Sequence, residues 1–402
     1  MEEEVKKELA ECLKDARDYI KGGMFEDAIE HLQIYIKDYP TVAPLYLYNG
    51  VAYCGLKNYR AAINFFQKTI ELDPNIDLAY SYMGGIYFGT EDYQTAGRYY
   101  RKAIELNPND PDGWYQLGNI SQREKKYQEA IQYFKKVIEI DPTRKKIYND
   151  LGLVHFNQKD YQEAIRCFQK SRRSDPKHIP TLLLISETYR LLKDYEEAIR
   201  YCKKALYVNP QEQLIYIEMG MVYTELENLD KALSCFQQAL DINDKEIVVI
   251  HNIGIVYYRW KKYQEAITYF KKVIAIDPEY TVAYYNLGGA YFYLEDYDNA
   301  LKYYQVIFDF MPQEADAYNN IGIIYAHMED YEKALQYFQI SIDIEKNPKT
   351  YTNIGNVYGD LNNEEKRIYY YKKAAQLGDE DAQQWLTEEN ITWNDNVKNI
   401  NE

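Results

Sequence analysis

Apolar residues recur with a fixed period along almost the whole chain. Between Trp114 and Pro142 they are spaced mostly by three or four residues, with helix-forming polar residues between them. A shift of 34 residues leads from each of them to a residue of the same kind: Trp114, Leu117, Gly118, Ala130, Phe134 and Pro142 become Tyr148, Leu151, Gly152, Ala164, Phe168 and Pro176. Such spacing places apolar side chains on one face of a helix, so each period predicts two amphipathic helices joined by a turn.

The period holds its register over most of the sequence. With Trp114 at position 4 of its unit, units start at residues 9, 43, 77, 111, 145, 179, 213, 247, 281 and 315 without an insertion, and an eleventh starts at 348. Residues 1–8 are predicted to extend the first helix. The repeats are expected to span 9–381.

Each unit carries its own helix signals. The first helix, helix A, has Gly at position 8, which costs about 1 kcal/mol relative to Ala. We expect Gly there because the backbone of the second helix, helix B, approaches; Ser186 replaces it in one unit. Helix B begins with capping-box patterns such as Asp160 with Glu163, and Asp194 with Glu197. It ends at Asp-Pro or Asn-Pro pairs, because proline lacks the N–H group.

The 34-residue period and the residues at positions 4, 7, 8, 20, 24 and 32 resemble the tetratricopeptide repeat, a helix–turn–helix unit. The resemblance implies an all-α fold, a right-handed α-α superhelix (TPR solenoid) of about eleven repeats with a C-terminal capping helix. It also implies that helix A lines a concave groove that holds an extended peptide or a partner's helix. The expected function is a non-enzymatic protein–protein interaction scaffold.

The end of the chain departs from the pattern. The unit at 348 has Arg367 where the others have Ala, and Ala374–Gly378 followed by Ala382 and Leu386 resembles a Sel1-type repeat. Residues 379–390 are predicted to form a capping helix over the last repeat. Residues 391–402 are polar and are predicted to be a mobile tail.

Charge narrows the choice of partner. The chain has 63 acidic and 47 basic residues, a net charge of −16. This argues against nucleic acid and anionic membranes as partners, and it favours a basic protein partner. No 18-residue apolar stretch occurs, the N-terminal residues have no apolar run, and the five cysteines form no Cys-x-x-Cys pair. These features predict a cytoplasmic protein with reduced thiols.

The sequence contains no recognisable catalytic or metal-binding motif. The five histidines are dispersed, and there is no His-Glu-x-x-His, Gly-rich phosphate loop or nucleophile elbow. We therefore expect no enzyme activity, no metal and no cofactor.

Position 6 of helix A gives the candidate binding residues. Four consecutive units carry Asn there, the asparagine ladder: Asn252, Asn286, Asn320 and Asn353. Asn is unfavourable inside a helix, and its amide can donate to and accept from a peptide backbone. The series resembles the asparagine ladder of the repeat superhelix of O-linked N-acetylglucosamine transferase, which implies backbone reading by these four residues. The alternative is that they reflect Asn-rich composition and repeat duplication. Inward positions add further candidates for the same patch: Asn319, Tyr258, Tyr285 and Phe292.

Other functions fit less of the pattern. No three consecutive units carry the Lys, Asn and Arg set of the carboxylate clamp, so binding to chaperone C-terminal tails is not expected. A structural subunit of a large assembly that uses its convex faces remains an alternative. A targeting arm for a separately encoded glycosyltransferase would need a catalytic domain, and only a cap and a tail follow the repeats.

Overall fold

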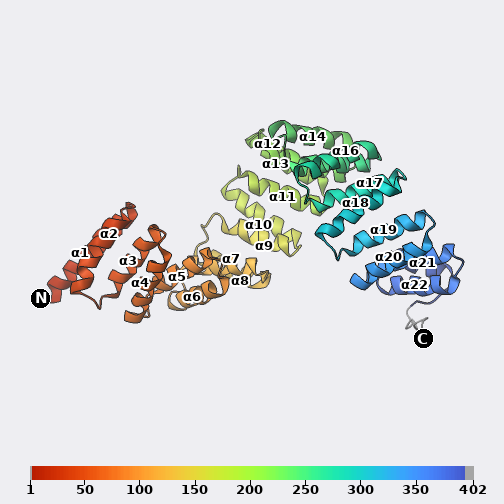
Figure 1. Cartoon of the computed structure of the whole chain (residues 1–402). Helices are drawn as coiled ribbons and strands as arrows, with labels where there is room; N and C mark the ends of the chain where they lie inside the picture. The colour runs from red at the N-terminus through yellow and green to blue at the C-terminus, as the bar shows by residue number, and fades with distance from the viewer. Residues whose placement is uncertain (1, 394–402) are drawn as a thin grey trace. The chain divides into compact units, whose positions relative to one another are not determined.

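The fold of residues 2–393 is all-α, an α-helical repeat solenoid (Figure 1). It was obtained as a computed structural model that describes these residues. They contain 23 helices, and no strand occurs among them. No helix within 2–393 is long and apolar enough to cross a membrane.

The chain divides into two compact units, Met1–Glu197 and Ala198–Glu402. The first contains α1 Glu2–Lys21, α2 Phe25–Asp38, α3 Ala43–Gly55, α4 Tyr59–Leu72, α5 Asp77–Gly89, α6 Tyr93–Leu106, α7 Pro111–Arg123, α8 Tyr127–Ile140, α9 Ile147–Asn157, α10 Tyr161–Ser174 and α11 Ile179–Leu191. Helix α12, Tyr195–Val208, includes the limit between the units. The second contains α13 Gln213–Glu225, α14 Leu229–Ile242, α15 Ile247–Arg259, α16 Tyr263–Ile276, α17 Thr281–Tyr293, α18 Tyr297–Phe310, α19 Ala315–His327, α20 Tyr331–Ile344, α21 Pro348–Asp360, α22 Glu364–Gln376 and α23 Glu380–Glu388.

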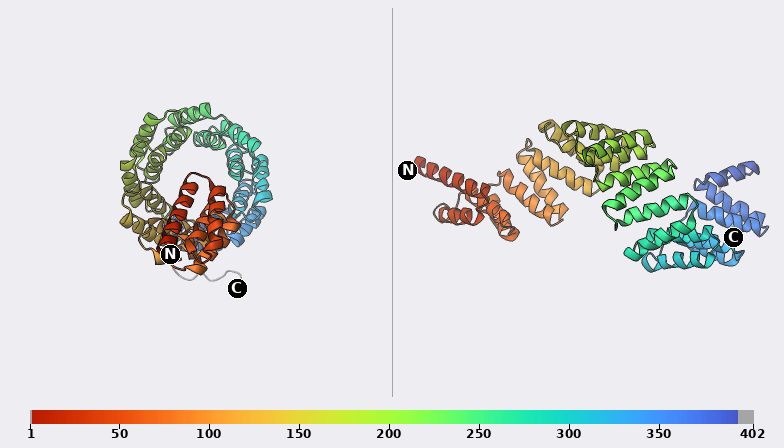
Figure 2. Two further views of the ribbon diagram at one scale, coloured as in Figure 1. Left: turned by 90° about the vertical axis from the view of Figure 1, so that its left-hand side faces the viewer. Right: turned by 90° about the horizontal axis from the view of Figure 1, so that it is seen from above.

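Odd-numbered helices up to α21 are the A helices and even-numbered ones up to α22 are the B helices. Within each of the two compact units, an A helix packs against the B helix that follows it, as α3 does on α4 and α17 on α18 (Figure 2). The B helix then packs against the next A helix, as α16 does on α17. Each hairpin thus completes its core with its neighbour, as expected of a repeat protein.

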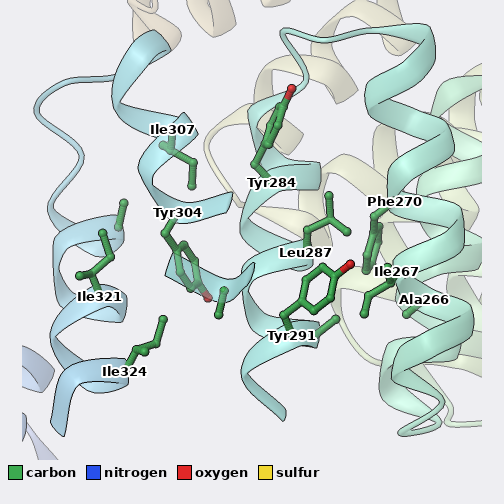
Figure 3. Close-up of a cluster of buried hydrophobic side chains, with 13 residues drawn as sticks. Ala266, Ile267, Phe270, Tyr284, Leu287, Tyr291, Tyr304, Ile307, Ile321 and Ile324 are labelled. Carbon is green, nitrogen blue, oxygen red and sulfur yellow. The ribbon is translucent and has the colours of Figure 1, made fainter. Parts of the chain in front are cut away.

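Apolar side chains from four consecutive helices form the core around α17. Phe270 of α16, Leu287 of α17, Tyr304 of α18 and Ile321 of α19 point into one cluster (Figure 3). Three of these four are fully buried, and Tyr304 is 6% exposed. Tyr284 and Tyr291, at positions 4 and 11 of α17, belong to the same cluster as Leu287 at position 7, so these side chains lie where the periodicity predicts.

The position-8 glycines face an aromatic ring of helix B, so the expectation that the helix B backbone excludes a side chain there is wrong. The nearest atoms to a Cβ on Gly254 would be those of the Phe270 ring, at 2.5 Å, and on Gly118 those of the Phe134 ring, at 2.3 Å. The group that excludes a side chain is therefore the aromatic ring at position 24 of helix B, and not the helix B backbone. The unit from 179 has Ser186 and Cys202 at these two positions, so the sequence there enlarges one residue and shrinks the other.

The turn between helices A and B has the same backbone in every repeat. Its position 15 has a positive φ, for example 59° at Lys261 and 60° at Glu295, and the residue is Gly only in the first repeat, at Gly23. The Lys262 N–H then donates to the Tyr257 carbonyl at 2.9 Å, the six-to-one bond of a Schellman motif.

This turn also alters the capping boxes. The Asp160 side chain caps α10 by accepting from the Glu163 N–H. The reciprocal half of the box is missing, because the Asp160 N–H already donates to the His155 carbonyl at 2.9 Å. Glu163 pairs with Arg166 instead.

Helix α23 packs on the last repeat. Ala382 and Leu386 are buried against Tyr371 and Ala375 of α22. Arg367, in the usual Ala position, places its guanidinium 4.4 Å from the centre of the Trp385 ring. Beyond the helix Ile391 and Trp393 pack on the same cluster, so the segment predicted to be a mobile tail begins with packed residues. The rest of that tail, 394–402, lies outside the described residues.

Candidate peptide-binding face

The A helices of the second unit form one continuous face. Beyond their contacts with B helices, α13 contacts α15, α15 contacts α17, and α19 contacts α21. The A helices are thus spaced closely enough to touch across a repeat. Side chains at positions 5, 6, 12 and 13 of successive A helices meet along this face, as His251 does with Asn286, Asn319 with Asn353, and Phe292 with His327.

Two members of the asparagine ladder link neighbouring helices. The Asn286 Nδ2 group of α17 lies 2.9 Å from His251 Nε2 of α15. The Asn353 Nδ2 group of α21 donates to Asn319 Oδ1 of α19, also at 2.9 Å. In both, position 5 of one repeat bonds to position 6 of the next. Asn319 therefore belongs to the same network, but as a partner within the protein.

The other two ladder residues, Asn252 and Asn320, make no side-chain hydrogen bond to another described helix. Asn252 Nδ2 donates to the Val248 carbonyl of its own helix at 2.9 Å. For the Asn320 amide the described residues provide no hydrogen-bond partner. The four amides are therefore not equivalent. Asn320 offers its full capacity, and each of the others retains its Oδ1 atom and one N–H.

His251 was not among the sequence candidates, although it occupies an inward position. Its ring packs on Phe270 and Tyr280, with centroids 5.6 and 5.3 Å away. Burial lowers the pKa of His251, which keeps the imidazole neutral and able to accept from Asn286. His251 stands at position 5 of its helix A, the same position as Asn319 in its repeat. A search of the inward positions for all residue types, and not only for Asn and aromatic residues, would have found it.

The three aromatic candidates are half-buried and pack within the protein. Tyr258 makes edge contacts with Tyr263 and Tyr293, and burial raises its pKa to about 12. Its hydroxyl lies against Gly289, where a Cβ would come within 2.9 Å. Burial, reinforced by the charge of Glu314, raises the pKa of Tyr285.

Phe292 lies beside an opening in this face. Its ring makes an edge contact with His327, with centroids 4.9 Å apart. His327 also lines a cavity of about 210 Å³ between α19 and α21, together with Ile323, Ala326, Phe338, Asn353, Asn356, Val357 and Asp360. Asn353 thus lines this cavity, and Phe292 is connected to it only through its contact with His327.

Two charged residues on A helices of the first unit, Asp150 and Arg190, have partners within the protein. Asp150 accepts from the Tyr115 hydroxyl at 3.0 Å, and burial raises the pKa of Asp150. Arg190 is 7% exposed and lies 3.9 Å from Glu187. Burial leaves Arg190 little surface for a ligand, whereas Asp150 is only partly buried and lines a cavity.

Sequence models of the tetratricopeptide repeat match the chain at residues 13–41, 50–76, 111–144, 144–208, 211–279, 279–347 and 348–377, and a TPR repeat model matches 84–124. The chain belongs to the tetratricopeptide repeat family. Proteins of this family are generally protein-interaction scaffolds that bind protein or peptide partners. No curated protein matches this TPR chain.

Solved structures with the same fold include the C-terminal part of a TPR repeat-containing protein from Cytophaga hutchinsonii. It is 20% identical, with a TM-score of 0.53, over 60% of this chain and 99% of that one. The APC/C hetero-tetramer Cut9–Hcn1 matches at 15% identity and a TM-score of 0.46, over 86% of this chain and 89% of that one. YrrB, described as a TPR protein with an unusual peptide-binding site, matches at 20% identity and 0.41, over 46% and 96%. At these identities the likeness concerns the fold alone.

Proposed function

We propose that this TPR protein is a non-enzymatic scaffold that holds an extended peptide of a partner protein on the A-helix face of its second unit. The observation that carries the proposal is the line of position-6 amides on α15, α17, α19 and α21, which ends at the cavity beside Asn353. An amide can donate to one peptide group and accept from another whatever the side chains of the peptide are.

The hydrogen bonds that Asn286 and Asn353 make to the preceding repeat support this proposal. Each uses one N–H and holds the side chain in place, so the remaining oxygen and N–H are pre-oriented at no further entropic cost. Tyr258, Tyr285 and Phe292 would then act as walls whose packing fixes the shape of the groove.

The test compares variants that spare the inter-repeat bonds. Peptides selected from a random nonapeptide library on the full chain would be titrated against wild type and against Asn252→Ala/Asn320→Ala. Two lost hydrogen bonds of about 1 kcal/mol each predict binding weaker by roughly thirtyfold. Gln264→Ala/Gln305→Ala, two exposed amides on B helices, is the matched control and should bind as wild type does.

Equal affinity of wild type and the Asn252→Ala/Asn320→Ala variant would exclude the ladder as a reader of peptide backbone. If peptide affinity is unchanged in both double variants, the result would favour the alternative of a structural subunit that uses its convex faces.

A further inference from the structure

A second opening lies between α5 and α7 in the first unit. This notch has a volume of about 640 Å³. Its lining includes Asp77, Leu78, Ser81 and Tyr82 of α5, and Asp110 and Asp112 at the start of α7. The residues from α5 occupy positions 1, 2, 5 and 6 of their repeat, so the notch opens on the A-helix face of this unit.

The rim of the notch is acidic and incompletely neutralised. Of the three carboxylates, only Asp112 is paired, with the Arg144 guanidinium at 2.7 Å. Asp77 accepts from the neutral Asn107 amide at 2.9 Å, and Asp110 caps α7 by accepting from the Asp112 N–H at 3.0 Å. No Lys, Arg or His lines the notch. Two negative charges are therefore left without an ion pair within residues 2–393.

The floor of the notch is apolar and exposed. Leu78 is 47% and Tyr82 is 37% exposed, and because they are four residues apart they share one side of α5. The Tyr82 ring stacks on Phe66 with centroids 5.3 Å apart, which holds it as a rigid contact surface. Rigid aromatic surface of this kind contributes area to binding at low entropic cost.

Ser81 adds an unused hydrogen-bonding group. Its Oγ atom is buried, and the described residues offer it no hydrogen-bond partner. Since a buried polar atom without a partner is costly, a ligand group that reaches Ser81 would gain from satisfying it.

The acidic rim is not a general property of the repeat. At the equivalent place two repeats later, a cavity of about 360 Å³ is lined by Lys145, Lys146 and His178, with Asn149 and Asp150. Lys145 and Lys146 stand at the positions of Asp77 and Leu78. The repeat scaffold thus accepts either charge at this place, and the charge at the α5–α7 notch calls for a separate explanation.

We propose that the notch between α5 and α7 binds a segment of a partner protein in which a Lys or Arg stands next to a bulky aliphatic or aromatic side chain. The basic group lies between Asp77 and Asp110, and the apolar side chain lies on Leu78 and Tyr82. The inference rests on the proposed scaffold function, but it concerns a different surface from the asparagine ladder.

The experiment uses the same random nonapeptide library on the full chain, followed by titration of enriched peptides at low salt. The test variant is Asp77→Asn/Asp110→Asn/Asp112→Asn, which keeps side-chain shape and a favourable cap at position 110. The matched control is Glu71→Gln/Glu105→Gln/Glu139→Gln. It changes the net charge equally at exposed B-helix sites, each of which forms only a surface ion pair with a lysine.

Peptides that pair a basic residue with a bulky apolar one should be enriched on wild type. Their affinity should fall roughly tenfold in the Asp→Asn triple variant and by less than about twofold in the control. Leu78→Ser, a change at an exposed side chain, should weaken the same peptides and remove the preference for an apolar neighbour.

Enriched peptides without Lys or Arg, or peptides equally sensitive to both triple variants, would overturn the notch proposal. If all enriched peptides respond only to Asn252→Ala/Asn320→Ala, the scaffold function stands and the notch proposal fails. If the library yields no binder, both fail.

Discussion

At the residue scale, ten of the A–B turns place a residue other than glycine in the left-handed backbone region. This conformation costs roughly 1–2 kcal/mol for a residue with a Cβ, because the Cβ crowds the following carbonyl oxygen. The turn keeps it because the Schellman bonds satisfy carbonyls at the end of helix A.

Lys261→Gly should therefore stabilise the protein. Relief of the left-handed strain, offset by the greater freedom of Gly in the unfolded chain, predicts a gain of about 0.5–1 kcal/mol. Lys272→Gly, the same exchange in the interior of α16, should cost about 1 kcal/mol. Urea denaturation of both variants measures the change in the free energy of unfolding, which should be a gain for Lys261→Gly and a loss for Lys272→Gly. A loss of stability in Lys261→Gly would refute the strain argument.

Asn49 is the clearest departure from the core pattern. It occupies position 7 of its repeat, in α3, where all the repeats from residue 77 onward carry Leu, Ile or Met, and it is fully buried. Neither its Oδ1 nor its Nδ2 atom finds a hydrogen-bond partner among the described residues.

Asn49→Leu should raise stability by about 1–3 kcal/mol, because it removes an unsatisfied buried amide and adds apolar contact. Leu117→Asn, the reverse exchange at the same repeat position, should destabilise by at least as much. Thermal melting followed by circular dichroism tests both. An unchanged or lower melting temperature for Asn49→Leu would mean that the amide has a partner in solution.

At the scale of the helical hairpin, the pair formed by position 8 and position 24 decides how closely helices A and B pack. Gly254 with Phe270 and Gly322 with Phe338 show the common solution, a missing side chain facing a ring. Ser186 and Cys202 in the unit from 179 suggest that the two positions exchange volume.

Gly254→Ser should cost about 1–3 kcal/mol by overpacking, and Phe270→Cys about 3–5 kcal/mol by leaving a cavity. Gly254→Ser/Phe270→Cys should cost less than the sum by at least about 1 kcal/mol, because each change accommodates the other. Gly254→Ser combined with Phe338→Cys, in a different hairpin, should be additive. Additivity in the first pair would show that the volumes are not coupled.

At the scale of the whole molecule, the main helix–helix contacts among residues 2–393 lie within one hairpin or between neighbouring hairpins. A destabilising substitution should then affect mainly its own hairpin and the adjacent ones, because the stability of such arrays is nearly a sum of repeat and interface terms.

Gly288→Leu forces a side chain into the Tyr304 ring, which would lie 2.7 Å from its Cβ. Amide hydrogen exchange should accelerate in α17, α18 and the helices that flank them, while α3 to α6 keep their wild-type rates. Acceleration spread evenly over both units would instead indicate a single cooperative fold.

The sequence alone determined the fold class and the repeat, because a 34-residue period constrains each residue mainly by its own hairpin and its neighbours. It also located the A-helix face and, through position 6, the asparagine ladder, whose role in binding remains a proposal.

The tertiary structure decided what depends on a neighbour in space. It showed that Asn286 and Asn353 are tied to His251 and Asn319, that rings and not backbone face the glycines, and that Ile391 and Trp393 pack on the last repeat. It also showed the division into two units, which the unbroken spacing of the repeats conceals. Periodicity records which face of a helix a residue occupies. Which atom it meets across the interface depends on the size of the side chains on both sides.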